Sequence, residues 1–218
     1  MVISVSLTGS SADRLVDTEF ELEVYFILKR LFDVSVSAIL LFLLSPLLII
    51  VSIAIFVSSP GPVIFTQKRL TKNSKIFTMY KFRSMKFDAE KNTGAVWAGE
   101  NDNRITSFGS FIRKTRIDEL PQLINVIKGD MSLIGPRPER PEIASELEKQ
   151  YPYFNKRLAT LAGITGYAQV QVGYVADVDS YKYKLDYDLE YIRKQSIMLD
   201  LQIALKTILV VITGSGAR

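Results

Sequence analysis

The sequence contains no histidine and no cysteine among its 218 residues. Without cysteine, the chain has no disulfide bonds, no thiol nucleophile and no thiolate metal site. Without histidine, it cannot form a Ser–His or Cys–His catalytic relay or an imidazole zinc site. Any catalysis must therefore use carboxylates, lysine, tyrosine, or a hard cation bound by oxygen ligands.

Acidic residues are scarce in the middle of the chain, where residues 58–140 contain 15 Lys/Arg against 8 Asp/Glu. The first 28 residues have the opposite bias, with five acidic residues and a single arginine. A basic surface suits a phosphate-bearing partner, which can be an anionic lipid, a nucleotide or a nucleic acid. A solvated basic surface without a partner explains the same composition equally well.

Charge is absent from Val34 to Val57, a run of 24 residues. As one helix this run would be about 36 Å long, enough to cross a bilayer. A core helix so uniformly apolar is unusual in a small domain, so the run predicts attachment to a membrane. Ser45-Pro46 falls at the midpoint, and proline predicts a kink there. Each half, about 18 Å long, could reach the bilayer centre and return.

Basic residues flank this run on both sides. They are Lys29 and Arg30 before it, and Lys68, Arg69, Lys72 and Lys75 after it. By the positive-inside rule, both flanks belong on the cytoplasmic side, as in a re-entrant helix–break–helix hairpin. A kinked helix that spans the bilayer is an equal alternative on physical grounds, because such helices tolerate proline.

The remaining elements are predicted from local pattern. Residues 196–212 are apolar but include Asp200 and Lys206, which indicates an amphipathic helix on the membrane surface or packed beneath the domain. Elsewhere the pattern predicts extended segments at 63–69 and 75–85, a loop at 88–104, helices at 141–161 (broken near Pro152) and 183–196, and a turn and strand at 162–173.

An Asp-Glu pair precedes an apolar run in RIDELPQLINVIKGD, residues 116–130. Asp118 suits an N-cap, Pro121 a first helical turn and Gly129 a C′ position, so a helix is predicted over 119–128. The free N–H groups of a helix N-terminus favour negative charge, which would keep Asp118 ionised and able to act as a nucleophile. Taken alone, the pair is more simply explained as a helix cap.

Cations elsewhere in the sequence favour a catalytic role. Arg137 and Arg140 lie in the proline-stiffened segment GPRPERP, 135–141, and arginine binds phosphate oxygens through two parallel hydrogen bonds. Lys81 and Arg83 add two more positive charges. A carboxylate nucleophile beside a phosphate-binding cluster, with a second carboxylate able to hold Mg²⁺, is equipped for phosphoryl transfer.

Several motifs together resemble the bacterial sugar transferase family, the monotopic phosphoglycosyl transferases that start the assembly of surface glycans. They are KRLFD (29–33), the Ser45-Pro46 break, GPVIFTQKR (61–69), MYKFRSM (79–85), DNRITSFGSFIRKTRIDELPQLINVIKGDMSLIGPRPERP (102–141), GITGYAQV (163–170) and DLEYIRKQSIMLDLQIALKTI (188–208). The resemblance runs from about residue 25 to residue 212, and the block around the Asp-Glu pair is its most specific part.

The resemblance implies an α+β, mostly helical fold, with a re-entrant membrane helix hairpin, a small cytoplasmic catalytic domain and amphipathic interfacial helices. Residues 1–24 would be an N-terminal extension and residues 25–58 the re-entrant segment, with its bend at Ser45-Pro46. Residues 59–218 would be the catalytic domain, ending in an amphipathic helix. The expected location is the cytoplasmic face of the bacterial inner membrane.

The resemblance also implies transfer of a sugar 1-phosphate from a UDP-sugar to a polyprenol phosphate such as undecaprenyl phosphate, with Mg²⁺ and release of UMP. Asp118 would attack the β-phosphorus and hold the phosphosugar covalently, while Glu119, with Asp118, would place the metal. The other candidate site residues are Lys81, Arg83, Arg104, Arg137, Arg140 and Gln169 for substrate or phosphate binding, and Asp188 and Asp200 as supporting acids. The expected sugar is a hexose such as galactose or glucose. A phospholipid membrane is an expected partner, nucleic acid is not, and a homodimer is a further option.

Two other functions fit parts of the sequence. A non-catalytic, membrane-attached scaffold or regulator of polysaccharide assembly would need the apolar run and the basic surface, but not the Asp-Glu pair. A processive glycosyltransferase would need a metal-binding Asp-x-Asp motif. Its candidate, residues 101–103, reads Asn-Asp-Asn in a polar loop where a turn is favoured. Release of UMP rather than UDP from a UDP-sugar would separate these functions from phosphoglycosyl transfer.

Overall fold

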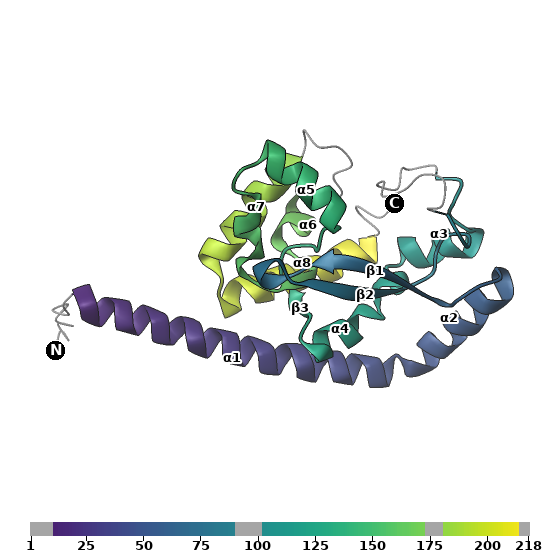
Figure 1. Cartoon of the computed structure of the whole chain (residues 1–218). Coiled ribbons are helices and arrows are strands. Elements are labelled where there is room, and N and C mark those ends of the chain that lie inside the picture. The colour runs from purple at the N-terminus through teal and green to yellow at the C-terminus, as the bar shows by residue number, and fades with distance from the viewer. Residues whose placement is uncertain (1–10, 90–101, 173–180, 214–218) are drawn as a thin grey trace.

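The computed structural model describes residues 11–89, 102–172 and 181–213, and gives only the backbone for 11–21 and 212. Most of the predicted loop at 88–104 lies outside these residues. The described chain is mostly helical and contains two small sheets of two strands each, in agreement with the predicted α+β class (Figure 1).

Two helices form the long arm that contains the apolar run. Helix α1 (Ser11–Leu43) extends along one side of the domain, and α2 (Ser45–Ser58) bends at its end toward α3 (Ser107–Lys114) (Figure 1). The break has a local cause. Pro46 has no N–H to donate to the carbonyl of Phe42, and the Ser45 hydroxyl donates to that carbonyl instead, at 2.7 Å. The predicted break at Ser45-Pro46 is therefore confirmed.

The bend between the two helices is 63°. Within the described residues no helix is by itself long and apolar enough to cross a bilayer, whereas Leu22–Leu43 and Ser45–Ser58 are so when taken together. A re-entrant hairpin and a kinked spanning segment are both compatible with this bend, so the hairpin stays a prediction.

A polar face of α1 attaches this arm to the domain. Asp200 of α8 (Ile197–Thr213) accepts hydrogen bonds from Tyr25 at 2.9 Å and from Lys29 at 2.7 Å. The carboxylate of Asp33 accepts from the backbone N–H of Leu133 at 3.2 Å. Tyr25, Lys29 and Asp33 are spaced by four residues and so lie on one side of the helix. We call the contacts of Tyr25 and Lys29 with Asp200 the α1–α8 clamp.

Arg30 is also engaged within the protein. It donates to the carbonyls of Val126 and Ile127, at 2.7 and 3.0 Å, near the end of α4 (Gln122–Lys128). Lys29 and Arg30 were the flanking charges before the apolar run, and both have partners in the domain. Because these two charges have partners in the fold, they are weaker support for a cytoplasmic flank at that end of the run.

The two sheets are simple. Strands β1 (Ile64–Leu70) and β2 (Ile76–Phe82) form an antiparallel hairpin through the short helix η1 (Lys72–Ser74). Strands β3 (Met131–Ile134) and β4 (Ala162–Thr165) pair in parallel. The end of that pair is crowded, because a Cβ on Gly163 would lie 2.1 Å from the nitrogen of Gly135.

The remaining elements are α3 (Ser107–Lys114), η2 (Ile117–Glu119), α5 (Pro141–Gln150), η3 (Phe154–Ala159), α6 (Tyr167–Val172) and α7 (Tyr181–Lys194). One sequence prediction is wrong here, since residues 167–172 form a helix after β4 rather than part of a strand. Their alternating pattern is overridden by packing on α7, where Tyr167 meets Tyr187 edge-on with ring centroids 5.5 Å apart.

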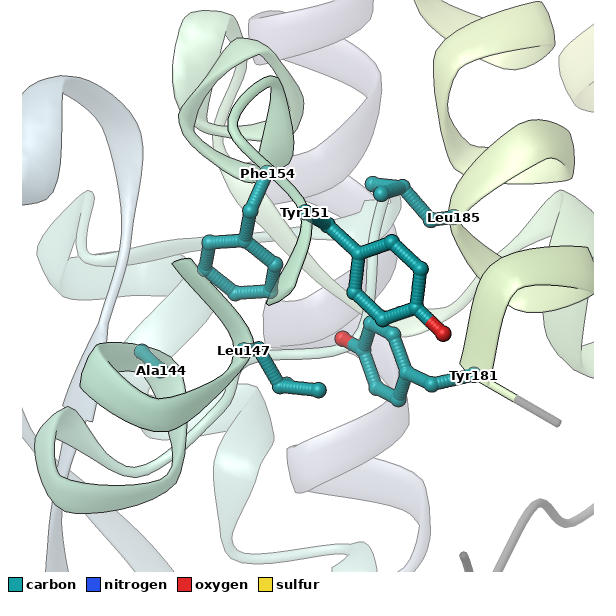
Figure 2. Packing of buried hydrophobic residues seen from close by; sticks show 6 residues of the cluster. All are labelled: Ala144, Leu147, Tyr151, Phe154, Tyr181 and Leu185. Carbon is teal, nitrogen blue, oxygen red and sulfur yellow. The ribbon is translucent and has the colours of Figure 1, made fainter. Parts of the chain in front are cut away.

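A compact apolar cluster joins α5, η3 and α7. Figure 2 shows its members, which are Ala144, Leu147, Tyr151, Phe154, Tyr181 and Leu185. The Tyr181 ring lies 6.0 Å from the Phe154 ring and 6.5 Å from the Tyr151 ring, between centroids. This cluster holds α7 against α5 and η3, the two elements that follow the proline-rich segment 135–141.

Candidate active site

The Asp-Glu pair lies on a short turn between two helices. Helix α3 ends at Lys114, and Arg116 follows in the left-handed conformation with φ 58°. Its carbonyl accepts a hydrogen bond from the N–H of Glu119 at 3.1 Å, which begins the 3₁₀ turn η2. Helix α4 starts only at Gln122, so its N-terminal boundary differs from the prediction.

Asp118 does not cap this helix. The N-cap of α4 is Pro121, and no side chain caps it. Pro121 and the preceding Leu120 both have helical backbone angles, which shifts the Asp-Glu pair into the preceding turn. The cap interpretation of Asp118 is therefore wrong. The predicted C-terminal end is confirmed, with Gly129 left-handed at φ 87°.

Glu119 is the anchored member of the pair. Its Oε1 atom accepts from Lys81 Nζ at 2.9 Å and from Arg137 Nη2 at 2.7 Å. Burial tends to raise the pKa of Glu119, but the charges of Arg137 and Lys81 outweigh burial and hold that pKa well below its usual value. Glu119 is thus a fixed anion that gathers two cations from β2 and the proline-rich segment.

Asp118 is the uncommitted member. Its side chain is buried, yet within the described ranges no hydrogen bond or ion pair to its carboxylate is found. Burial raises the pKa of Asp118, and the Glu119 charge adds to the rise, while Lys81 opposes it. Two adjacent carboxylates whose environments push their pKa values apart are suited to different roles.

The segment that supplies Arg137 is held by buried charges. The carbonyl of Arg137 accepts from Arg157 Nη2 at 2.7 Å, and Arg157 pairs with Asp188 at 2.7 Å. Glu139 pairs with Lys184 and accepts from the Tyr181 hydroxyl at 3.2 Å. These contacts fix the segment on η3 and α7. Asp188 therefore supports the site indirectly, through Arg157.

Some predicted phosphate ligands have partners elsewhere. The guanidinium of Arg83 donates to the carbonyls of Ser59 and Pro60, at 2.5 and 2.8 Å. These hydrogen bonds hold the segment that follows α2. Arg104 pairs with Asp102 two residues earlier, at 2.5 Å. Neither contact involves the Asp-Glu pair.

The other predicted residues are also accounted for. Arg140 lies 3.6 Å from Glu142 as an ion pair, and the amide nitrogen of Gln169 donates to the carbonyl of Ile164 at 3.1 Å. Asp200 belongs to the α1–α8 clamp. Of the predicted site residues, the structure brings Lys81 and Arg137 together with the Asp-Glu pair.

Sequence reasoning missed several residues that build the site. Arg157 and Lys184 carry no motif signal, because their roles depend on contacts 31 and 45 residues away in sequence. Asn125 could have been noticed as a polar residue in the apolar run LINVI. Its side chain accepts from the N–H of Tyr80 at 3.0 Å and donates to the carbonyl of Thr78 at 2.8 Å, which attaches α4 to β2.

The arrangement offers few protein ligands for a metal. No group of three or more Asp or Glu side chains that could hold an ion occurs in the described part of the chain. One oxygen of Glu119 already accepts from two cations. The available donors are the Asp118 carboxylate and the second oxygen of Glu119, a set that suits Mg²⁺ bound mainly by substrate phosphates and water.

The sequence model of the bacterial sugar transferase family matches residues 24–214. The chain belongs to this family. A UDP-N-acetylgalactosamine-undecaprenyl-phosphate N-acetylgalactosaminephosphotransferase from Aeromonas hydrophila is 45% identical over 195 residues, which cover 89% of this chain and 46% of that protein. The chain thus spans about half the length of that bacterial sugar transferase.

Two further relatives are informative. A putative undecaprenyl-phosphate N-acetylgalactosaminyl 1-phosphate transferase from Bacillus subtilis (strain 168) is 52% identical over 62% of this chain and 75% of its own length. A UDP-glucose:undecaprenyl-phosphate glucose-1-phosphate transferase from Xanthomonas campestris pv. campestris is 40% identical over 84% of this chain and 38% of its own length. All three names contain the same lipid acceptor, whereas two contain N-acetylgalactosamine and one contains glucose.

Proposed function

We propose that this chain is a phosphoglycosyl transferase, which moves a sugar 1-phosphate from a UDP-sugar to undecaprenyl phosphate and so initiates surface glycan assembly. The observation that carries the proposal is the contrast within the Asp-Glu pair. Asp118 is buried and uncommitted, while Glu119 binds Lys81 and Arg137 beside it. A free carboxylate next to clustered cations supports attack on an anionic phosphorus centre.

In the first step, a carboxylate oxygen of Asp118 attacks the β-phosphorus of the UDP-sugar. The bond between that phosphorus and the oxygen bridging to the α-phosphate breaks, and UMP leaves with the bonding electrons. The product on the enzyme is an aspartyl phosphosugar. Lys81 and Arg137 offset the negative charge that gathers at the phosphorus, and the Glu119 anion holds both cations in place.

In the second step, a phosphate oxygen of undecaprenyl phosphate attacks the same phosphorus. The bond to Asp118 breaks, the carboxylate is restored, and the sugar leaves on a lipid diphosphate. One site can serve both substrates, because the same phosphorus is transferred twice. The covalent intermediate keeps the water-borne donor and the lipid acceptor from having to bind together.

Mg²⁺ is part of the proposal. When bound, it would neutralise charge on the diphosphate and on the departing UMP. Asp118 and the second oxygen of Glu119 are the protein ligands that would hold it.

We propose attachment to one leaflet of a membrane, and the exposed apolar surface supports contact with lipid. Large apolar side chains more than half exposed line α1 and α2, and they include Leu31, Phe32, Ile39, Phe42, Leu43, Ile49, Ile50, Ile53, Phe56 and Val57. Helix α8 buries Ile203 against the domain and exposes Ile197, Met198, Leu201, Leu205, Ile208 and Leu209. Helix α8 is therefore packed on one face and able to enter the interface with the other. The cytoplasmic face is the expected side.

The sugar is best identified by a donor panel. Galactose and glucose are the sugars expected from the sequence, and the names of the Aeromonas and Bacillus relatives add N-acetylgalactosamine. UDP-glucose, UDP-galactose and UDP-N-acetylgalactosamine should be compared by the rate of UMP release.

The decisive experiment replaces Asp118 by asparagine. The structure removes the main confounding factor, because Asp118 caps no helix and the change preserves shape. Purified protein with Mg²⁺ and the active UDP-sugar, without lipid acceptor, should gain the mass of one sugar phosphate and release about one equivalent of UMP. Asp118→Asn should do neither. Glu119→Gln should also be severely impaired, because Lys81 and Arg137 lose their shared anion.

Asp186→Asn is the matched control, since Asp186 is exposed on α7. It should behave as the unmodified protein. An active Asp118→Asn variant, or an adduct on another residue, would refute Asp118 as the nucleophile. If the unmodified protein releases no UMP with any donor, the non-catalytic scaffold becomes the better explanation.

A further inference from the structure

Gln122, the first residue of α4, has a buried amide that the fold does not use. Its side chain is 1% exposed, and in the part of the chain that the structure describes its amide nitrogen has no hydrogen-bond partner. A buried amide in this state destabilises the fold, because it has lost its water and gained no partner in return. Buried polar groups are nearly always paired, so this exception calls for an explanation.

Asn125, on the same helix, shows how the fold treats a structural amide. It is 0% exposed, and both ends of its side chain are paired with β2. The oxygen accepts from the N–H of Tyr80 at 3.0 Å, and the nitrogen donates to the carbonyl of Thr78 at 2.8 Å. The amide of Gln122 therefore differs in kind from the one that attaches α4 to the sheet.

The backbone brings Gln122 beside the Asp-Glu pair. Leu120 and Pro121 have helical backbone angles, so the chain follows one helical path from the turn η2 into α4. Asp118 and Glu119 precede Gln122 by four and three residues, the separations at which helical side chains are neighbours. Side chains on a helix lean toward its N-terminus, which for Gln122 is the direction of the pair.

Contacts on either side place Gln122 on the face of the helix that meets β2. Glu119, three residues earlier, accepts from Lys81 of β2 at 2.9 Å. Asn125, three residues later, accepts from Tyr80 of β2. Gln122 lies between these two contacts in the same row of side chains. Its amide is thus on the side from which Lys81 reaches the pair.

We infer that the side-chain amide of Gln122 is a substrate-binding group, which donates a hydrogen bond to a non-bridging oxygen of the β-phosphate of the nucleotide sugar. This inference rests on the proposed phosphoglycosyl transfer. Negative charge grows on those oxygens as Asp118 attacks, and a fixed donor stabilises it. A neutral donor also does so without forming an ion pair with the attacking carboxylate. The bound phosphate would supply the partner that the fold withholds.

The test is Gln122→Met, which keeps the length of the side chain and removes the amide. We expect adduct formation without lipid acceptor to slow by about tenfold or more, which is the loss of one donor to the transition state. We expect the melting temperature to stay the same or to rise by about 2–4 °C, because an unpaired buried amide has been removed. A residue with only a structural role would not lose activity while keeping or gaining stability.

A binding measurement tests the contact itself. Asp118→Asn cannot complete the first step, so the affinity for the active UDP-sugar can be measured in that background by calorimetry. Adding Gln122→Met to Asp118→Asn should raise the Kd by about fivefold or more, because the donor loses a hydrogen bond to a charged oxygen. This readout also excludes a role of Gln122 that acts only by orienting the Asp118 carboxylate.

Gln195→Met is the matched control. The amide nitrogen of Gln195 is also buried and has no hydrogen-bond partner among the described residues, but Gln195 lies in the connection between α7 and α8. The same substitution there should leave the rate of adduct formation unchanged. An equal loss of rate in Gln195→Met would mean that the effect does not arise beside the Asp-Glu pair.

The remaining outcomes also decide the inference. A rate or a Kd within about twofold of the reference value would overturn it and leave Gln122 as a packing residue. A melting temperature lowered by more than about 4 °C in Gln122→Met would overturn it as well, because the amide would then support the fold. If the unmodified protein releases no UMP and forms no sugar-phosphate adduct, the proposed function itself fails. UMP release by the unmodified protein, together with normal behaviour of Gln122→Met, refutes only the inference about Gln122.

Discussion

The surroundings of Glu139 allow a quantitative prediction of how the stability of the fold depends on pH. Its carboxylate is buried in the proline-rich segment, where it pairs with Lys184, accepts from Tyr181 and lies 3.9 Å from Arg69. Burial tends to raise the pKa of Glu139, but the charges of Lys184, Arg157 and Arg69 outweigh it and lower that pKa from 4.5 to about 2. We predict that Glu139→Gln destabilises the fold and removes a defined part of its dependence on pH.

The direction of this pH dependence follows from the coupling between proton binding and folding. A carboxylate with a lowered pKa in the folded state stabilises the fold above its unfolded pKa, and this contribution is lost as the pH falls through its folded pKa. The drop from 4.5 to about 2 corresponds to a stabilisation of about 3 kcal/mol at neutral pH. About 2 kcal/mol of this disappears between pH 6 and pH 3.

Lys184, the ion-pair partner of Glu139, reduces the size of this stabilisation. Burial lowers the pKa of Lys184 by more than the charge of Glu139 restores, so the ion pair as a whole contributes less than the Glu139 shift alone suggests. The change in the free energy of unfolding between pH 6 and pH 3 measures the Glu139 contribution better than the value at neutral pH, because Lys184 keeps its proton in acid.

The assay is urea unfolding in non-ionic detergent, followed by far-UV circular dichroism at pH 6 and pH 3. The free energy of unfolding should fall between these pH values by about 2 kcal/mol more in the unmodified protein than in Glu139→Gln. Glu146→Gln is the matched control, since the Glu146 side chain is 67% exposed and pairs with Lys149 at the surface. Equal pH dependence in the unmodified protein and Glu139→Gln would refute the reasoning.

Three further predictions concern the arm and the site. Single cysteines at Ser10 and Ser215 should both resist an impermeant thiol reagent in intact cells; labelling of one and not the other would mean a spanning helix. Arg137→Lys should reduce the transfer rate by about tenfold or more with the fold intact, because lysine keeps the charge but cannot donate the two parallel hydrogen bonds of a guanidinium. Near-normal activity would show that Arg137 does not belong to the site. Asp200→Asn should lower the free energy of unfolding by about 2–4 kcal/mol in urea titrations, because Lys29 is left buried without its anion; a change under about 0.5 kcal/mol would contradict the α1–α8 clamp.

Local chemistry let the sequence determine several features by itself. The absence of histidine and cysteine restricted catalysis to carboxylates and cations, and Pro46 determined the break after α1, since no tertiary contact can restore its missing N–H. Gly129 marked the end of α4 in the same way, through the left-handed backbone that glycine adopts freely. The hairpin strands followed from their β-branched and aromatic residues.

Only the tertiary structure decided which charges meet. Lys81, Arg83, Arg104 and Arg137 were equivalent candidates in the sequence, but two of them pair with Glu119 and two bond to the backbone or to a nearby aspartate. The order of strand and helix after residue 162 depended in the same way on packing against α7. Ion pairs between distant residues leave no periodic or local signal, because a side chain finds its partner only after the backbone has brought remote segments together.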